Sequence, residues 1–62
     1  MYKISIVFTD GDVAYYDGNE GTTIHISSYY GKTFPTYNSA LAFAKYLRKN
    51  FNQVVYTEIV EE

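Results

Sequence analysis

His25 and Ser27 are the side chains best suited to acid–base or nucleophilic chemistry, and they stand two residues apart. His25 is the only His, and in a chain without Cys it is the only side chain expected to titrate near neutral pH. In a strand, residues i and i+2 share a face with Cα atoms about 6.5–7 Å apart. A nucleophile also needs a base within reach and an orienting acid, whereas Ala14 is the expected cross-strand neighbour of His25. We therefore expect no catalytic residues, and a surface or interface position for His25.

Gly31-Lys32-Thr33 matches the end of a phosphate-binding loop. The full pattern requires a Gly five residues before Gly31, where this chain has Ile26. It also requires a strand-loop-helix context, but Pro35 and Thr36 intervene before the expected helix. The segment therefore predicts a structural turn, and no nucleotide or other cofactor is expected.

Two acidic segments resemble fragments of calcium loops, Asp10-Gly11-Asp12 and Asp17-Gly18-Asn19-Glu20. A calcium loop of the helix–loop–helix type needs oxygen ligands at alternate positions and a bidentate Glu at the twelfth. Neither Glu20 nor Gly21 supplies the required Glu at the twelfth position when the loop is counted from Asp10 or from Asp17. Both segments instead indicate hairpin turns, in which Asp, Asn and Gly adopt unusual dihedral angles, and no metal site.

Alternating apolar residues over 2–9 predict a strand with one buried face. Asp10-Gly11 suits a two-residue type I′ loop, because Asp tolerates and Gly readily adopts the positive φ values required. That loop pairs Thr9 with Asp12, Phe8 with Val13 and Ile6 with Tyr15. A four-residue loop at 18–21 then pairs Asp17 with Thr22, Tyr15 with Ile24 and Val13 with Ile26. We expect antiparallel strands at 2–9, 12–17 and 22–30.

One amphipathic helix is expected after Thr36, a competent N-cap. Its apolar stripe consists of Ala40, Phe43, Ala44, Leu47 and Phe51, with cations on the opposite side. The apolar residues between Gln53 and Val60 predict a fourth strand, whose place in the sheet is left open. The order β-β-β-α-β predicts an α+β fold in which one helix packs on one face of a mostly antiparallel four-stranded sheet.

The chain has 62 residues, of which 47% are apolar and 19% aromatic. We expect a single domain, 1–62, because two cores would each fall well below the roughly 40 residues at which unaided folding usually fails. Eight Tyr and four Phe, each able to bury about 150–250 Å², cannot all fit inside, so several Tyr should lie on the surface. Without Cys, a signal-like N-terminus or a long apolar run, the sequence predicts a soluble, cytoplasmic protein with no membrane contact.

The charge is dipolar: −3 in residues 1–30, +4 in residues 31–50 and −3 in residues 51–62. The sheet face away from the helix is expected to carry small, hydroxylated and aromatic side chains: Lys3, Ser5, Val7, Ala14, Tyr16, Thr23, His25, Ser27 and Tyr29. With only one helix predicted, no further element is available to cover this face. It is therefore either hydrated or occupied by a partner.

The element order, the Phe34-x-Thr36 helix entry followed by Ala40 and Ala44, and the acidic Tyr-rich composition resemble small accessory proteins of bacteriophages and prophages. The resemblance implies binding to host proteins, as in anti-CRISPR proteins and acidic DNA mimics. The helix entry also resembles the arm-binding domains of phage integrases. Those domains are basic on the sheet, whereas Lys3 is the only cation expected on this face.

We therefore expect a non-enzymatic protein-interaction module, of phage or mobile-element type, that binds and modulates a host protein, with nucleic-acid enzymes among the candidates. Tyr is enriched at protein interfaces because it combines rigid contact area with a polar tip. The expected contact residues are Tyr16, His25 and Tyr29 on the sheet face, with Asp10, Asp12, Asp17 and Glu20 in the acidic loops. Self-association through the sheet face or an edge strand would give a homodimer.

The alternative is a protein that binds single-stranded nucleic acid by stacking bases on the Tyr-rich face, where each stack contributes about 1–3 kcal/mol. The acids around the sheet oppose this alternative, because they would repel backbone phosphates.

Overall fold

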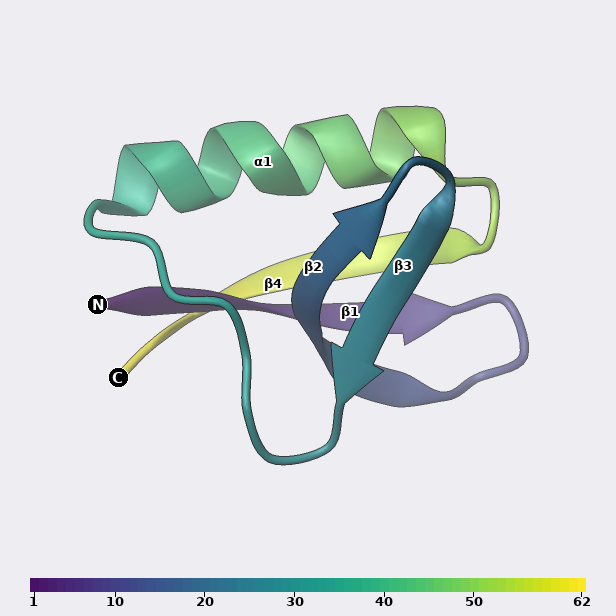
Figure 1. Cartoon of the computed structure of the whole chain (residues 1–62), viewed down its shortest axis with the longest axis horizontal. Helices are drawn as coiled ribbons and strands as arrows, with labels where there is room; N and C mark the ends of the chain where they lie inside the picture. The colour runs from purple at the N-terminus through teal and green to yellow at the C-terminus, as the bar shows by residue number, and fades with distance from the viewer.

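Four strands and one helix make up the fold, which a computed structural model describes for all residues 1–62 (Figure 1). In chain order they are β1 (Tyr2–Phe8), β2 (Val13–Glu20), β3 (Thr23–Ser27), α1 (Tyr37–Asn50) and β4 (Val54–Glu61). The strands form one antiparallel sheet in the order β3-β2-β1-β4, and α1 covers one face of it (Figure 1). The predicted α+β fold is confirmed, and β4 takes its place beside β1.

The hairpin between β1 and β2 has a three-residue loop instead of the predicted two-residue loop. The Phe8 N–H donates to the Asp12 carbonyl and the Gly11 N–H donates to the Phe8 carbonyl, both at 2.9 Å. Gly11 has φ +90° while Asp10 has no positive φ. This is the pattern of a type I turn closed by a glycine bulge, whereas a type I′ loop needs positive φ at both central residues.

The longer loop shifts the register by one residue and exchanges the two faces of β2. Ser5 pairs with Tyr15 and Ile6 pairs with Ala14. Tyr16, expected on the sheet face away from the helix, therefore points under α1 and is 2% exposed. The predicted pairs Thr9–Asp12, Phe8–Val13 and Ile6–Tyr15 are wrong.

The hairpin between β2 and β3 turns later in the chain than predicted. β2 runs to Glu20, which pairs with Thr23, so the loop contains only Gly21 and Thr22. Gly21 has φ +58° and Thr22 has no positive φ, the arrangement of a type II′ turn. The register shifts between Tyr16 and Asn19, so a bulge occupies this part of β2. The predicted four-residue loop, the pairs Asp17–Thr22, Tyr15–Ile24 and Val13–Ile26, and the extension of the third strand to residue 30 are wrong.

α1 begins as predicted, because Thr36 is its N-cap. The Ser39 N–H donates to the Thr36 hydroxyl oxygen at 3.1 Å, and the Thr36 N–H donates back to the Ser39 hydroxyl oxygen at 3.4 Å. These two bonds form a capping box. Ala40, Ala44 and Leu47 are the buried helical residues, and the two Ala let α1 lie close to the sheet.

The core lies between α1 and the sheet, and it includes Phe34 from the segment that enters the helix. Phe34 and Tyr2 exchange backbone hydrogen bonds of 2.7 and 2.9 Å, and the Lys32 N–H donates to the Tyr16 carbonyl at 2.8 Å. The segment 32–34 thus bonds to β1 on one side and to β2 on the other. The buried cluster consists of Ile4, Ile6, Tyr16, Phe34, Ala40, Ala44, Leu47, Phe51 and Val54.

Candidate interaction surfaces

The sheet face opposite α1 carries an apolar row across three strands. The register aligns Val13, Val7 and Tyr56 as cross-strand neighbours, and Val13 and Tyr56 are exposed. The adjacent row is more polar and consists of Ser27, Tyr15, Ser5 and Glu58. We call this side of the sheet, formed by these two rows and Lys3, the open face. Hydrophobic cross-strand neighbours of this kind normally stabilise a sheet by packing, and here their outer surface faces solvent.

The single cation of the open face, Lys3, is already engaged within the chain. Its Nζ atom lies 4.1 Å from the ring centroid of Tyr15 and 3.5 Å from Oε1 of Glu62. A cation over an aromatic face gains about 0.5–1 kcal/mol at exposed sites. Lys3 is therefore committed to Tyr15 and Glu62, which reduces what it can offer to an anionic ligand.

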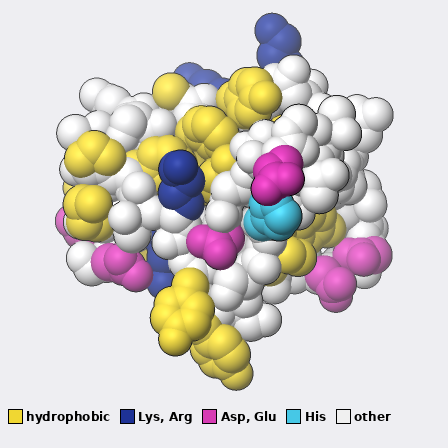
Figure 2. Space-filling view, in the orientation of Figure 1, with side chains coloured by type: hydrophobic (Ala, Val, Ile, Leu, Met, Phe, Trp, Pro, Cys, Tyr) yellow, Lys and Arg dark blue, Asp and Glu magenta, His cyan; other side chains and the backbone are white.

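The loop from Ser28 to Thr33 passes beside the open face and presents two aromatic rings. A Cβ atom placed on Gly31 would lie 3.2 Å from the Cβ atoms of Lys3 and Tyr15, so the backbone there is tightly packed. The Ser27 hydroxyl accepts hydrogen bonds from the N–H groups of Tyr29 and Tyr30 at 3.3 and 3.1 Å. The Tyr29 and Tyr30 side chains are nevertheless 82% and 76% exposed. Figure 2 shows hydrophobic side chains projecting at the lower margin, where this loop lies.

Tyr16, one of the predicted contact residues, belongs to the core instead. Its ring packs against Phe43 at a centroid distance of 5.0 Å, and its hydroxyl donates to Oδ1 of Asn19 at 2.6 Å. Burial raises the pKa of Tyr16 above its ordinary value of 10.0, and the neighbouring Tyr46 acts in the same direction. Tyr15 occupies the position on the open face that was predicted for Tyr16, because of the one-residue register shift.

His25 and Tyr29, two further predicted contact residues, are both exposed. His25 lies on the same face of β3 as Ser27, two residues before it, and its Nε2 atom is 3.8 Å from Oε1 of Glu20. Tyr29 lies beyond the end of β3, in the loop beside the open face. His25 and Tyr29 therefore lie at the surface, whereas Tyr16 is buried in the core.

The four predicted acidic residues are all exposed, but they are spread along β2 and its two ends. Asp10 and Asp12 belong to the first hairpin, where Oδ1 of Asp10 accepts a 3.0 Å hydrogen bond from the Asp12 N–H. Asp17 lies within β2, and Glu20 ends it. Asp10 thus has a turn-stabilising role, and the acids frame the sheet without forming one cluster.

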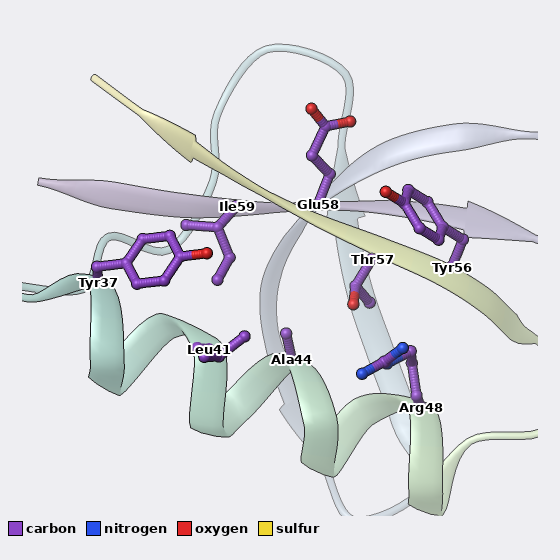
Figure 3. Close-up of a pocket in the computed structure, with 8 residues that line it drawn as sticks. All are labelled: Tyr37, Leu41, Ala44, Arg48, Tyr56, Thr57, Glu58 and Ile59. Atoms are coloured by element: carbon purple, nitrogen blue, oxygen red, sulfur yellow. The ribbon is translucent and has the colours of Figure 1, made fainter.

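A cavity of about 230 Å³ opens between α1 and β4 (Figure 3). Thr57 and Ile59 point from β4 toward the helix, and Glu58 points away from it (Figure 3). Arg48 lies at one end of the cavity and Tyr37 at the other (Figure 3). We call this space the edge groove; its lining also includes Leu41, Ala44 and Tyr56. The sequence alone could not reveal the edge groove, because it depends on β4 lying at the edge of the sheet.

The structure gathers no group of three or more His, Cys, Asp or Glu that could hold a metal ion. α1 is neither long nor apolar enough to cross a membrane.

Comparison with models of known protein families, with curated proteins and with solved structures finds no match to this chain.

Proposed function

We propose that this chain is a non-enzymatic protein-interaction module that binds a basic protein surface through its open face. The observation that carries the proposal is the apolar row of Val13, Val7 and Tyr56 on the side of the sheet that α1 does not cover. Tyr29 and Tyr30 are exposed in the loop that packs against the same face at Gly31. Fully desolvated aromatic residues at the centre of an interface typically supply most of the binding energy.

The conformation of the Tyr29–Tyr30 loop favours binding over disorder. Ser27 holds the start of the loop by two hydrogen bonds, and Gly31 packs against the sheet at its other end. An anchored backbone lowers the entropy that ordering the loop would cost on association. The backbone that carries the two exposed rings is thus held against the sheet.

Charge supports a basic partner. The acids Asp12, Asp17, Glu20 and Glu58 lie on or around the open face, where the cations are Lys3, paired with Glu62, and Lys32 in the adjoining loop. The cations Lys45, Arg48 and Lys49 lie on α1, which covers the opposite face. An acidic face attracts a basic protein surface and repels nucleic-acid phosphates.

The resemblance to small phage accessory proteins extends this proposal to a host protein, met in the cytoplasm and modulated by being bound. Burial of Tyr16 weakens the alternative of single-stranded nucleic-acid binding, because it removes one of the rings on which bases were expected to stack.

Site-specific photocrosslinking in a nuclease-treated bacterial lysate tests the proposal. A photoreactive phenylalanine analogue at Tyr30 should give a protein adduct that decreases as salt is added, because the proposed attraction is electrostatic. The matched control is the same analogue at Tyr46, an exposed ring on α1 that should give no adduct of that mass. A second chain with Val13→Glu should lose the Tyr30 adduct.

Two outcomes would contradict the proposal. Equal adducts from Tyr30 and Tyr46 would mean that the open face has no preference for the partner. An adduct from Tyr30 that appears only without nuclease would favour the nucleic-acid alternative.

A further inference from the structure

β4 leaves the longest unpaired edge of the sheet. It has eight residues and pairs only with β1, whereas β3, at the opposite edge, has five residues. Natural edge strands are usually protected by Pro, Lys, a bulge or a covering element. β4 contains neither Pro nor Lys; a bulge at Val55, between the pairs Val7–Tyr56 and Phe8–Val54, disturbs its start and leaves its pairing regular from Tyr56 to Glu61. Its edge is thus available for pairing with another strand.

The unpaired backbone groups of this edge belong to alternate residues. The Glu62 N–H donates to the Met1 carbonyl at 2.9 Å, and this bond shows which residues of β4 direct their backbone groups toward β1. Because bonding direction alternates along an antiparallel strand, the even-numbered residues bond toward β1. Along the regular part of β4, the N–H and C=O groups that point outward are those of Thr57, Ile59 and Glu61, whereas the bulge interrupts the alternation at Val55.

The side chains along this edge suit strand pairing. Val55 and Tyr56 are 58% and 53% exposed, and most of the strand is β-branched or aromatic. Thr57 and Ile59 form the β4 side of the edge groove, which lies directly beside the outward backbone groups (Figure 3). A neighbouring strand would therefore find both bonding partners and an apolar recess.

Charge is distributed along the edge in a self-complementary way. Glu58, Glu61 and Glu62 lie in or beyond the second half of β4. Arg48 and Lys49 lie in the last turn of α1, which the short segment 51–53 joins to the first half of β4. Two copies related by a two-fold axis would bring the acidic end of each β4 beside the basic helix end of the other.

We propose that two copies of this chain form a homodimer by antiparallel pairing of β4 with β4 about a two-fold axis at Thr57. Thr57 then faces Thr57 of the second copy, and Ile59 of each copy lies near the bulged Val55 of the other. The two sheets become one sheet of eight strands, with both helices on the same face.

The positions of the charged side chains and the alternation of the outward backbone groups place the axis at Thr57. The outward N–H and C=O groups of two copies can bond only in registers that place odd-numbered residues of β4 opposite odd-numbered residues of the second β4. An axis at Glu58 would place its carboxylate directly opposite the same carboxylate of the second copy, which is destabilising. An axis at Thr57 instead places Glu58 opposite Tyr56, and it brings Glu61 nearer to the basic helix end of the second copy than an axis at Ile59 would.

Light scattering coupled to size exclusion tests the dimer, and the wild-type chain should show twice the mass of one chain. Thr57→Pro should show the mass of one chain, because the Thr57 N–H points outward and its loss breaks no bond to β1. Val55→Lys, which places a cation on the edge, should likewise weaken the dimer. This variant provides the test of the edge if the Pro variant does not fold. Tyr29→Ala with Tyr30→Ala is the control and should keep the doubled mass.

A charge exchange tests the antiparallel arrangement. Arg48→Glu and Glu61→Arg should each lower the dimer fraction, and the double variant should recover it. Amide hydrogen exchange should show Thr57 and Ile59 protected as well as Glu58 and Val60, with protection of the odd-numbered amides lost on dilution.

A wild-type chain that has the mass of one chain at every concentration would overturn the proposal. Full dimer in Thr57→Pro and Val55→Lys would overturn the assignment to β4. Since the dimer leaves the open face free, loss of the Tyr30 crosslink and loss of the dimer are separate results.

Discussion

The hydroxyl of Tyr16 donates a 2.6 Å hydrogen bond to Oδ1 of Asn19. The Asn19 side-chain amide in turn donates to the Gly21 carbonyl at 3.1 Å, so a buried ring is connected to the turn between β2 and β3. A buried phenol without a partner would cost about 1–3 kcal/mol. The bulge in β2 places Asn19 where it can accept this bond. The Tyr16 hydroxyl therefore has a hydrogen-bond partner at the margin of the apolar core.

We expect the stability of the folded chain to fall as pH rises above about 10. Burial raises the pKa of Tyr16 above 10.0, so the folded state keeps the phenol proton to higher pH than the unfolded state. The stabilising contribution is therefore complete below pH 10.0 and is lost as pH rises through the folded-state pKa. Urea unfolding at a series of alkaline pH values would measure the slope.

Tyr16→Phe is the matched control, because it keeps the ring and removes the ionisable group. At neutral pH it should lower the free energy of unfolding by about 1 kcal/mol through loss of the bond to Asn19. Above pH 10.0 its stability should decline less steeply than that of the wild type. Parallel slopes for the two chains would show that Tyr16 does not drive the effect.

Both wrongly predicted registers involve β2, the strand whose two faces look alike. Val13-Ala14-Tyr15-Tyr16 is apolar at odd and even positions, so either register of β2 puts an aromatic residue inside. Gly11 supplies positive φ in both loop types, and only the loop length decides the register. β1 was predictable because its polar and apolar residues alternate, and α1 because Thr36 and the apolar stripe agree.

The candidate surfaces were predictable to different degrees. The exposure of the acids follows from their place in or near turns, and the structure agrees. Tyr29 was predicted to be exposed on a strand, and it is exposed in the loop after β3. Tyr15 could not be distinguished from Tyr16 without the register. The edge groove depends on β4 pairing with β1, a long-range contact that no local pattern specifies.

Leu47→Ala should destabilise the fold by about 2–5 kcal/mol, because Leu47 is fully buried and the truncation leaves a cavity. Leu47→Asp should prevent folding, since it would bury an unpaired charge. The control, Tyr29→Ala with Tyr30→Ala, should stay within about 0.5 kcal/mol of the wild type. Circular dichroism during urea unfolding compares the three, and unfolding of the double Tyr variant would show that the loop rings are structural.

Gly11→Ala should destabilise the fold by about 1–2 kcal/mol. The cause is backbone strain alone, because Gly11 has φ +90° and a Cβ atom there would meet nothing within 4 Å. Gly11→Asn should cost less, since Asn tolerates positive φ better than Ala. Thermal unfolding of the two variants checks the order, and an Ala variant as stable as the Asn variant would contradict the glycine-bulge loop.

Thr36→Ala should lower the free energy of unfolding by about 0.5–2 kcal/mol, because the Ser39 N–H would lose its acceptor at the start of α1. The cost should appear as fraying of the first turn, which carries no acidic residue to compensate the helix dipole. Thr36→Ser keeps the hydroxyl and should retain nearly all of the stability. Amide exchange at Ser39 and Ala40 would locate the effect. If Thr36→Ser lost as much stability as Thr36→Ala, the loss would come from the Thr methyl group and not from the cap.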